Sequence, residues 1–344
     1  MTAPPLPWFA ATARPCPLYL APMSGYTDSA FRDLCKAHGA DVLLTEFVQA
    51  TPLVRDIERA WRTIHFPPHQ RPAGIQIFGA TPGTMAHAAR LLQERLRPDF
   101  IDINLGCPAH KVVEQNAGAA LLRTPALLQE IATAVVNAVP CTPVTAKIRL
   151  GWDATSINAT DTARRLEDAG VRALAIHGRT RAQGYSGEAD WGEIARVTAT
   201  VTLPVIGNGD LRDAATARKR WQESGVSALM IGRAALGNPW LFREIHAALH
   251  DAPPPPPPTP RERLATLLTY ARALATHDAT AHRTQRDDDA PGLRWILPKL
   301  YPFIHSVPGS RKLREKLSAC HTLGEMESLL TRTEWADHPS PSPD

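Results

Sequence analysis

Short apolar runs alternate with amphipathic stretches along the first 250 residues of the chain. Most of the apolar runs lead into glycine, proline or polar residues, a pattern that predicts buried strands followed by turns. We expect eight strands, at residues 18–21, 41–46, 74–78, 100–104, 143–148, 173–176, 204–206 and 228–231. The stretches between them predict helices at residues 29–38, 55–61, 125–139, 160–169, 191–198, 214–223 and 239–249.

This alternation favours one fold class. Strands that alternate with helices predict a parallel sheet with right-handed crossovers. Eight units over about 230 residues match the size of a closed (β/α)8 barrel, the TIM barrel. The alternative is a doubly wound sheet, whose first strand leads into a GxGxxG turn, and no such turn follows residues 18–21. We therefore predict an α/β chain that begins with a TIM barrel.

The composition changes abruptly after residue 249. Residues 252–260 read APPPPPPTP, an extended spacer that cannot continue a helix. We place a barrel domain at residues 1–250, a proline-rich linker at 251–260 and a small all-α helical domain at 261–344. Within the last domain we expect helices at 261–276, 293–305, 310–317 and 323–330, with a polar loop around Asp287–Asp289.

Cysteine usage and hydropathy indicate a reducing compartment. The five cysteines are an odd number without repeated spacing, which argues against a disulfide framework. The first residues lack the pattern of a signal peptide, and no run of about 18 uncharged apolar residues occurs. We expect a cytoplasmic protein that has no membrane span and is a monomer. The net charge of +4 is small, so the location of the charges matters more than their sum.

The candidate chemistry lies at the carboxyl ends of the expected strands, where TIM barrels carry their active sites. Listed along the chain, the polar or turn-forming residues there are Pro22, Met23, Gln76, Asn104, Cys107, Lys147, Arg149, His177, Asn208, Gly209, Asp210, Gly232 and Arg233. Among them we find neither a cluster of acidic residues nor matched Cys/His pairs, so we predict no metal site.

Two of these strand ends present reactive or charged groups. The sequence DINLGCP, at residues 102–108, places an amide and a thiol three residues apart, and we expect Cys107 to do the bond-making chemistry. The alternative is that Cys107 is a small buried apolar residue.

Lys147 and Arg149 face the same side of their strand because side chains alternate. A lysine buried there needs an anionic partner, whereas a lysine at the solvated rim does not.

The last two strand ends predict a phosphate site. IGNGD at residues 206–210 and MIGRAA at 230–235 offer glycines, exposed backbone N–H groups and Arg233. The alternative is that Gly209 and Gly232 are only turn glycines.

A phosphate here, Lys147 and His177 nearby and Gln76 across the barrel would suit flavin mononucleotide, FMN, whose reduced ring is anionic. His177 could instead be a core histidine bonded to backbone.

The motifs taken together resemble a known family. LAPMSGYTD (20–28), IQIFG (75–79), DINLGCP (102–108), AKIRLGW (146–152), HGRTRAQGYSGEADW (177–191), NGD (208–210) and MIGRAA (230–235) resemble the bacterial type of tRNA-dihydrouridine synthases, in order. The resemblance implies an FMN-bound barrel that reduces a D-loop uridine of tRNA to 5,6-dihydrouridine with NADPH. The basic stretch at 291–318 is similar to the helical domain of that family.

The resemblance also implies roles for matching residues. Cys107 would protonate carbon 5 of the uracil while a hydride passes from flavin N5 to carbon 6, and Asn104 would hold the uracil. Pro22, Met23, Gln76, Lys147, His177, Asn208, Gly209, Asp210, Gly232 and Arg233 would line the flavin. The chemistry is sound for a thiol, because a group with a pKa near 8.5 is protonated at neutral pH yet can donate.

Basic residues in the second domain indicate RNA binding. Between residues 291 and 320 the basic residues are Arg294, Lys299, Arg311, Lys312, Arg314 and Lys316, against the single acid Glu315. Trp295, Tyr301 and Phe303 lie among them, and such a mixture suits an RNA backbone and unstacked bases. Arg149, Arg179 and Arg181 would contact the tRNA beside the active site. The alternative is an ordinary solvated helix face.

Two rival functions stay open at this point. One is an FMN barrel that reduces a free small molecule, of the dihydropyrimidine or dihydroorotate dehydrogenase type, which has no need for a basic helical domain. The other is an RNA-binding module without catalysis, and the presence of Cys107, Lys147, His177 and Arg233 argues against it. The motifs mix cues from different subfamilies, so the position of the modified uridine stays open.

Overall fold

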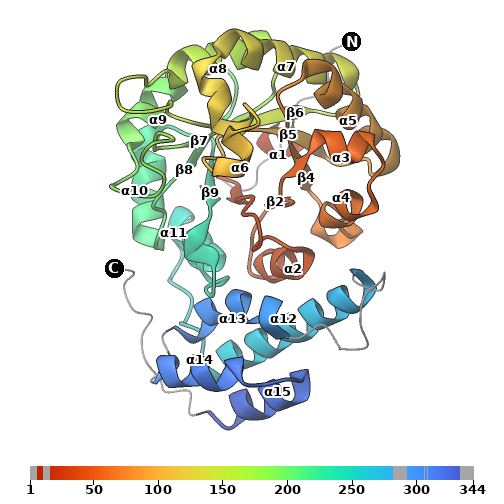
Figure 1. Ribbon diagram of the computed structural model, residues 1–344. Helices are drawn as coiled ribbons and strands as arrows, with labels where there is room; N and C mark the ends of the chain where they lie inside the picture. Colours follow the sequence, from red (N-terminus) through yellow and green to blue (C-terminus); the bar gives the residue numbers. More distant parts are fainter. Residues whose placement is uncertain (1–5, 11–15, 282–292, 306, 308, 334–344) are drawn as a thin grey trace.

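Nine parallel strands form one sheet in the described part of the chain, and eight of them close into a barrel (Figure 1). The computed structural model describes residues 6–10, 16–281, 293–305, 307 and 309–333. The strands are β1 (Leu18–Leu20), β2 (Val42–Leu44), β3 (Val48–Gln49), β4 (Ala73–Phe78), β5 (Phe100–Leu105), β6 (Val144–Arg149), β7 (Leu174–His177), β8 (Val205–Asn208) and β9 (Ala228–Ile231). Pairing of β2 with β4 closes the ring, while β3 pairs only with the end of β4. The predicted TIM barrel is confirmed.

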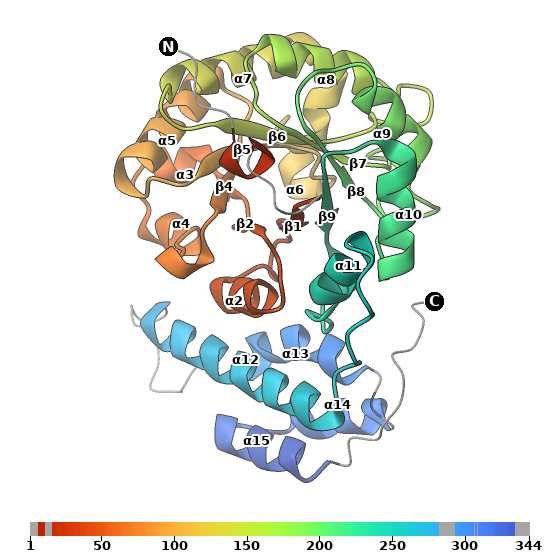
Figure 2. The ribbon, with the colours of Figure 1, turned by 180° about the vertical axis from the view of Figure 1, so that it is seen from behind.

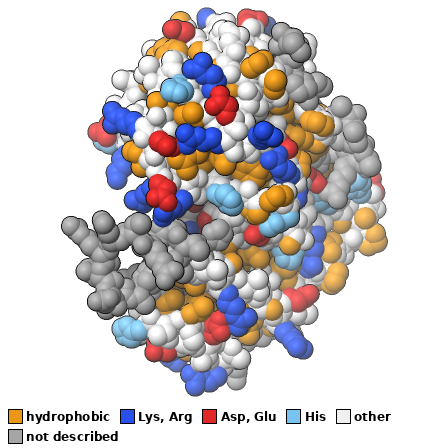
Figure 3. All heavy atoms as spheres, turned by 90° about the vertical axis from the view of Figure 1, so that its right-hand side faces the viewer, with side chains coloured by type: hydrophobic (Ala, Val, Ile, Leu, Met, Phe, Trp, Pro, Cys, Tyr) orange, Lys and Arg blue, Asp and Glu red, His pale blue; other side chains and the backbone are white. Residues whose placement is uncertain are grey.

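Helices surround the barrel. They are α2 (Ser29–Ala37), α3 (Ala50–Val54), α4 (Glu58–Thr63), α5 (Pro82–Arg95), α6 (His110–Val113), α7 (Pro125–Ala138), α8 (Ala159–Asp168), α9 (Trp191–Thr198), α10 (Ala214–Ser224) and α11 (Leu241–Leu249), with 3-10 turns at Pro68–Gln70, Gly118–Arg123 and Arg233–Ala235. Figure 3 faces the side of the molecule on the right of Figure 1, where positive and negative side chains lie interspersed. No helix among the described residues combines the length and the apolar character needed to cross a bilayer.

Two sequence predictions need correction between β2 and β5. The helix expected at residues 55–61 exists but begins later, as α4 at Glu58–Thr63, because the chain turns between α3 and α4 with Asp56 at a φ of 56°. Helix α5 was absent from the prediction altogether. Its buried residues Met85, Ala88, Ala89 and Leu92 have helical spacing, but half of them are alanines, so the apolar stripe is narrow and easily missed.

The barrel interior is apolar at its amino-terminal end. The side chains of Tyr19, Val42, Leu44, Phe100 and Ile206 pack together there with the small Ala173, Ala175 and Ala228. Helix α1 (Pro7–Ala10) closes this end and lies towards the viewer in Figure 2. Its Trp8 donates a hydrogen bond from Nε1 to the Tyr19 hydroxyl at 2.6 Å. The amino-terminal end is thereby sealed, which leaves the carboxyl ends of the strands for chemistry.

Four further α-helices follow the barrel in the described part of the chain. Helix α11 ends at Leu249, residues 250–259 form neither helix nor strand, and α12 (Pro260–Ala281) starts the second part. After a 3-10 turn at Leu293–Trp295 come α13 (Leu297–Ile304), α14 (Ser310–Ser318) and α15 (Leu323–Thr331). The loop expected around Asp287–Asp289 lies outside the described residues, as do residues 334–344.

The helical part packs directly on the barrel through α12 and α13 (Figure 1). Tyr270 of α12 lies between the rings of Phe31 and Phe303, at centroid distances of 5.8 and 5.7 Å. Its hydroxyl donates to Asp28 Oδ2 at 3.0 Å, and Lys299 Nζ forms an ion pair with the same oxygen at 2.7 Å. Asp28 also caps α2 by accepting from the Phe31 N–H. One carboxylate thus joins the loop after β1 to both α12 and α13.

We expect Gly237→Ala to loosen this contact between the two parts. Gly237 has a φ of 71°, and an added Cβ would lie 2.4 Å from the Pro302 carbonyl carbon of α13. Such overpacking should lower stability by roughly 1–3 kcal/mol beyond the strain of the positive φ. Gly309→Ala is the matched control, because Gly309 has a φ of 72° with nothing within 4 Å of the added Cβ. Equal unfolding temperatures for the two variants would contradict the close approach.

Candidate functional site

The polar residues of the barrel interior gather at the carboxyl ends of the strands. Alternation along β6 turns Thr145, Lys147 and Arg149 inward, while Ala146 and Ile148 pack against the helices. The register places Lys147 beside Asn104 of β5, and Arg149 beside His177 of β7. The strand ends therefore bring these predicted site residues together in one layer.

A chain of hydrogen bonds runs from the barrel interior to Cys107. The buried Asp102 accepts from Thr145 Oγ1 at 2.5 Å and from Gln76 Nε2 at 2.6 Å. Gln76 Oε1 accepts from Asn104 Nδ2 at 2.8 Å. Asn104 Oδ1 in turn accepts from the Cys107 N–H at 2.9 Å. The chain joins β6, β4 and β5 and ends on the turn that carries the thiol.

The direction of this chain follows from its first member. An ionised carboxyl group can only accept hydrogen bonds, so Gln76 must turn its NH₂ group towards Asp102. The Gln76 oxygen then faces Asn104, whose NH₂ group donates to it, and the Asn104 oxygen is left for the backbone N–H of Cys107. Each amide side chain is thereby held in one of its two orientations, which fixes the turn at Cys107.

Cys107 itself is only partly buried and forms no disulfide bond. Burial raises the pKa of the thiol above its usual value, although the backbone at Ala109 and the charges of Arg149 and Lys147 oppose the rise. The thiol is therefore protonated at neutral pH. A thiolate formed at this position would be stabilised by the same two cations, so the site suits a proton donor.

The side of the site next to β5 is cationic, because β6 carries Lys147 and Arg149. Burial, aided by the neighbouring Arg149, lowers the pKa of Lys147 to about 8, and Lys147 Nζ donates to Asn208 Oδ1 at 3.1 Å. Burial and the charges of Lys147 and Arg149 lower the pKa of His177, which is neutral at pH 7. Asn208 Nδ2 donates to the Met230 carbonyl at 2.7 Å and is thereby oriented towards Lys147.

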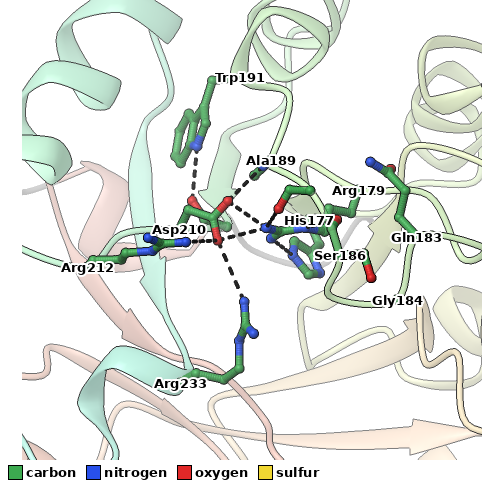
Figure 4. Close-up of polar contacts among 12 residues, drawn as sticks. His177, Arg179, Gln183, Gly184, Ser186, Ala189, Trp191, Asp210, Arg212 and Arg233 are labelled. Carbon is green, nitrogen blue, oxygen red and sulfur yellow. Dashed lines mark hydrogen bonds and ion pairs between the residues drawn. The ribbon is translucent and has the colours of Figure 1, made fainter. Parts of the chain in front are cut away.

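Asp210 organises the end of β8 (Figure 4). It forms an ion pair with Arg179 at 2.7 Å, lies 3.6 Å from Arg233, and accepts from the Ala189 N–H at 2.8 Å. Burial would raise the pKa of this carboxyl, but the Ala189 N–H and Arg179 outweigh it, and the pKa is lowered. Gly209, with a φ of 127°, leaves no room for a side chain, because an added Cβ would lie 2.6 Å from Ala189 Cβ.

Two arginines predicted to contact tRNA lie buried. Arg149 is 2% exposed and donates to the Thr180 and Gly184 carbonyls at 2.8 Å each. Arg179 is 1% exposed and, besides Asp210, donates to the carbonyls of Ser186 and Gly187. RNA contacts would be exposed, whereas these two guanidinium groups are buried. They donate hydrogen bonds to backbone carbonyl groups of the loop that follows β7.

Lys299 also lies elsewhere than expected. Its ammonium group pairs with Asp28 and its side chain is 14% exposed, so it holds α13 on the barrel. On α14, by contrast, Arg311 and Lys312 are exposed, and Arg314 lies partly buried with its guanidinium 5.9 Å from the Tyr301 ring centroid. The side chain of Arg294 lies outside the described residues. Of the expected basic residues of the helical part whose side chains the structure describes, those on α14 lie towards the surface, and Arg311 pairs there with Glu315 at 3.6 Å.

The remaining predicted residues surround the strand ends. Pro22 and Met23 follow β1, and Met23 Sδ lies 3.7 Å from the place of a Cβ on Gly232. That distance is an ordinary contact, so packing alone does not require glycine there. The exposed ring of Tyr185 also lies here, with its centroid 4.3 Å from the Arg233 guanidinium carbon and 6.2 Å from that of the His177 ring.

Sequence reasoning missed the roles of Asp102 and Thr145. Both were visible as polar residues with the inward parity of Asn104 and Lys147, so strand alternation could have found them. A cavity of about 360 Å³ beside Trp8 and Asp41 lies at the other end of the barrel, away from these groups. Among the residues that the structure describes, no three His, Cys, Asp or Glu side chains gather as metal ligands would.

A TIM barrel with a thiol and several cationic side chains at the carboxyl ends of its strands has the arrangement of an enzyme barrel. The family model for dihydrouridine synthase matches residues 19–336, and the chain belongs to this family. The predicted family and enzyme class are thereby confirmed.

Curated relatives agree with the family model. The chain is 40% identical over 301 residues to tRNA-dihydrouridine synthase B of Pseudomonas aeruginosa, covering 88% of this chain and 87% of that protein. It is 44% identical over 289 residues to a probable tRNA-dihydrouridine synthase of Rhizobium leguminosarum bv. phaseoli, covering 83% and 86%.

Solved structures share the fold. TcOYE in complex with pHBA matches with a TM-score of 0.51 at 13% identity, over 71% of this chain and 91% of that chain. Histamine dehydrogenase from Rhizobium sp. 4-9 matches with a TM-score of 0.51 at 14% identity, over 74% of this chain and 48% of that chain. At such identities the likeness shows the barrel architecture alone.

We expect Asp102→Asn to make the stability of the protein less dependent on pH. Burial raises the pKa of Asp102 to about 6, so the folded protein binds this proton more tightly than the unfolded chain, whose carboxyl has a pKa of about 3.9. The free energy of unfolding should therefore fall as the pH rises from about 4 to about 6, by roughly 3 kcal/mol. Denaturant unfolding at pH 4 and pH 7 measures this fall, which the asparagine variant should lack.

Asp102→Leu serves as the control for the hydrogen bonds. Asparagine still offers an oxygen to Gln76, whereas leucine leaves Gln76 Nε2 and Thr145 Oγ1 without an acceptor, so the leucine variant should be less stable than the asparagine variant at both pH values. A fall of equal size in the wild type and in Asp102→Asn would show that other groups cause it.

Proposed function

We propose that this protein is a tRNA-dihydrouridine synthase that reduces a D-loop uridine of tRNA to 5,6-dihydrouridine, with FMN as cofactor and NADPH as reductant. The observation that carries the proposal is the position of the Cys107 thiol at the carboxyl ends of the strands, near enough to Lys147 and Arg149 of β6 for their charges to lower its pKa. Saturating the C5–C6 bond of uracil needs a proton on one carbon and a hydride on its neighbour. The family match and the names of the relatives support the same reaction.

The side chains at the strand ends fit FMN. Lys147 is a partly buried cation whose hydrogen-bond partner is an amide, and among the described residues no carboxylate lies within ion-pair distance of it. Asp102 acts on it only from beyond that distance, so the charge is only partly compensated, which favours an anionic ligand. Lys147 and the neutral His177 would face the polar edge of the ring, and Gln76 would face it from β4. Pro22, Met23 and Asn208 would line the remaining edges.

The ends of β8 and β9 suit the phosphate of FMN. Gly209 brings its backbone close to the ring of His177, and the backbone at Gly232 is open beside Met23. Arg233, whose side chain is 51% exposed, would donate to the phosphate, while Asp210 would hold Arg233 and Arg179 in place. When bound, reduced FMN would supply the hydride from its N5 to carbon 6 of the uracil.

The chain's own residues supply the rest of the reaction. Cys107 would donate its Sγ proton to carbon 5, and the charges of Lys147 and Arg149 would stabilise the resulting thiolate. Asn104 donates one N–H to Gln76 and accepts from the Cys107 backbone, so its second N–H is the group left to hold a uracil oxygen. The uridine must leave its stack to reach this position.

We assign the two parts of the chain different tasks. Residues 1–250 would bind FMN and carry the chemistry, and residues 261–344, joined by the linker at 251–260, would hold the tRNA. The exposed Arg311 and Lys312 on α14, with Arg314 against Tyr301, support this assignment. A reductase of free small molecules has no use for such a basic helix.

The function is tested with the purified protein, an in vitro transcribed tRNA and NADPH. We expect dihydrouridine in the tRNA, detected by mass spectrometry of the digested product, and much slower reduction of free uridine or uracil because these lack contacts to the helical part. Fast reduction of free uracil without turnover of tRNA would instead favour the small-molecule enzyme.

Cys107→Ala should separate the two half-reactions. Reduction of the flavin by NADPH needs no proton from this thiol and should stay within about twofold of the wild type, whereas dihydrouridine formation should fall by about 10²–10⁴. Stopped-flow absorbance of the flavin follows both steps. Cys107→Ser is the control for size, since a hydroxyl is a weaker acid and should also slow the second step. Equal loss of both half-reactions would argue against the assigned role.

A further inference from the structure

Two guanidinium groups contact one indole ring at the rim of the barrel. The Arg123 guanidinium carbon lies 4.0 Å from the ring centroid of Trp152, and that of Arg181 lies 4.4 Å from it. The three residues come from the 3-10 turn after β5 and from the loops that follow β6 and β7. We call them the rim cluster. The cluster lies at the carboxyl ends of the strands, as Cys107 does.

The rim cluster is held in place by backbone hydrogen bonds. The Arg181 N–H donates to the Gly151 carbonyl at 2.9 Å, and the Ala182 N–H donates to the Trp152 carbonyl at 2.8 Å. Asn158 Nδ2 donates to the Leu122 carbonyl at 2.7 Å, which ties the β6 loop to the turn that carries Arg123. The side chains are therefore organised before any ligand arrives, which lowers the entropy lost on binding.

The charge of the rim cluster is uncompensated. Over the described residues, no carboxylate lies within 4.0 Å of Arg123 or Arg181, and Arg181 Nε is buried without a hydrogen-bond partner. Some other arginines of the barrel do have acidic partners: Arg95 pairs with Asp56 and Arg71 with Asp99. Two neighbouring cations without an acid repel each other, and an anion would remove that repulsion.

The rim cluster and the helical part lie on opposite sides of the barrel. Around the barrel, β6 lies across from β1, and the helical part packs on α2, which follows β1. The mouth that holds Cys107 therefore lies between the rim cluster and the helical part (Figure 1). A molecule large enough to span the mouth would contact both.

We propose that the rim cluster is a second RNA-binding surface, which binds the phosphate backbone of the tRNA on the side of the mouth away from the helical part. A guanidinium that stacks on an indole keeps its N–H edge free for phosphate, and such bidentate pairing is specific to arginine. The Trp152 ring faces are used by the arginines, which favours phosphate over a stacked base as the ligand. This inference rests on the proposed function and adds a contact site to it.

The test measures binding of an in vitro transcribed tRNA to the full-length protein over a range of salt concentrations. Each phosphate contact contributes about one unit to the slope of log affinity against log salt. Arg123→Gln should weaken binding about fivefold to tenfold and lower that slope by about one, whereas Arg123→Lys should keep the slope. Arg181→Gln should behave as Arg123→Gln does.

Arg95→Gln is the matched control. Arg95 also stacks on a tryptophan, Trp61, at 4.6 Å, but it lies in the last turn of α5, before β5 and away from the mouth. Its substitution should leave affinity and slope unchanged. Unfolding temperatures within a few degrees of the wild type verify that all variants fold.

The outcomes separate this inference from the proposed function. If the wild type forms dihydrouridine while Arg123→Gln and Arg181→Gln bind tRNA with wild-type affinity and slope, the rim cluster is no RNA site and the function stands. If Arg95→Gln weakens binding as much as Arg123→Gln, the effect is one of overall charge and the inference fails. If the wild type neither binds nor reduces tRNA, the proposed function fails and the inference fails with it.

Discussion

The arrangement of the site depends on one buried carboxyl group. Asp102 lies inside the barrel, 2% exposed, and as an acceptor it imposes a direction on Gln76, Asn104 and the turn at Cys107. Its charge is partly offset by Lys147 on the neighbouring strand β6, and each of the two shifts the pKa of the other towards the charged form against the effect of burial. The anion and the cation in one apolar barrel thus each lower the cost of burying the other.

The position of the helical part likewise depends on one carboxyl group, that of Asp28. The loop that carries Pro22 and Met23 runs from β1 to α2, and Asp28 at its end caps α2 while accepting from Tyr270 and Lys299. Gly25 of the same loop donates to Glu46, whose pKa is raised by burial. Because one loop carries predicted flavin contacts and anchors α12 and α13, the placement of the second part is coupled to the lining of the site.

The sequence predicted the barrel and most residues at its mouth, because strand alternation and strand ends are local properties. Cys107, Lys147 and His177 could be placed from the motif that precedes each of them. Lys299 could not, since its partner Asp28 lies 271 residues away and an ion pair across parts leaves no local signal. Arg149 and Arg179 look like other arginines in sequence, and only the folded loop after β7 shows that its carbonyl groups occupy them.

The positions of the charged side chains also explain how a chain with a net charge of only +4 could bind a polyanion. Some arginines on the outer helices are paired with acids, as Arg95 with Asp56 and Arg62 with Glu58, and these pairs contribute little net field. Cations also lie on two sides of the mouth, at the unpaired rim cluster and on α14, where Arg311 pairs with Glu315 at 3.6 Å. Salt screens exposed charges beyond about 8 Å, so an RNA phosphate responds to the nearest groups and hardly to the total. Two short cationic surfaces on either side of a protonated thiol would orient the RNA over the mouth, which a uniform positive charge would not do.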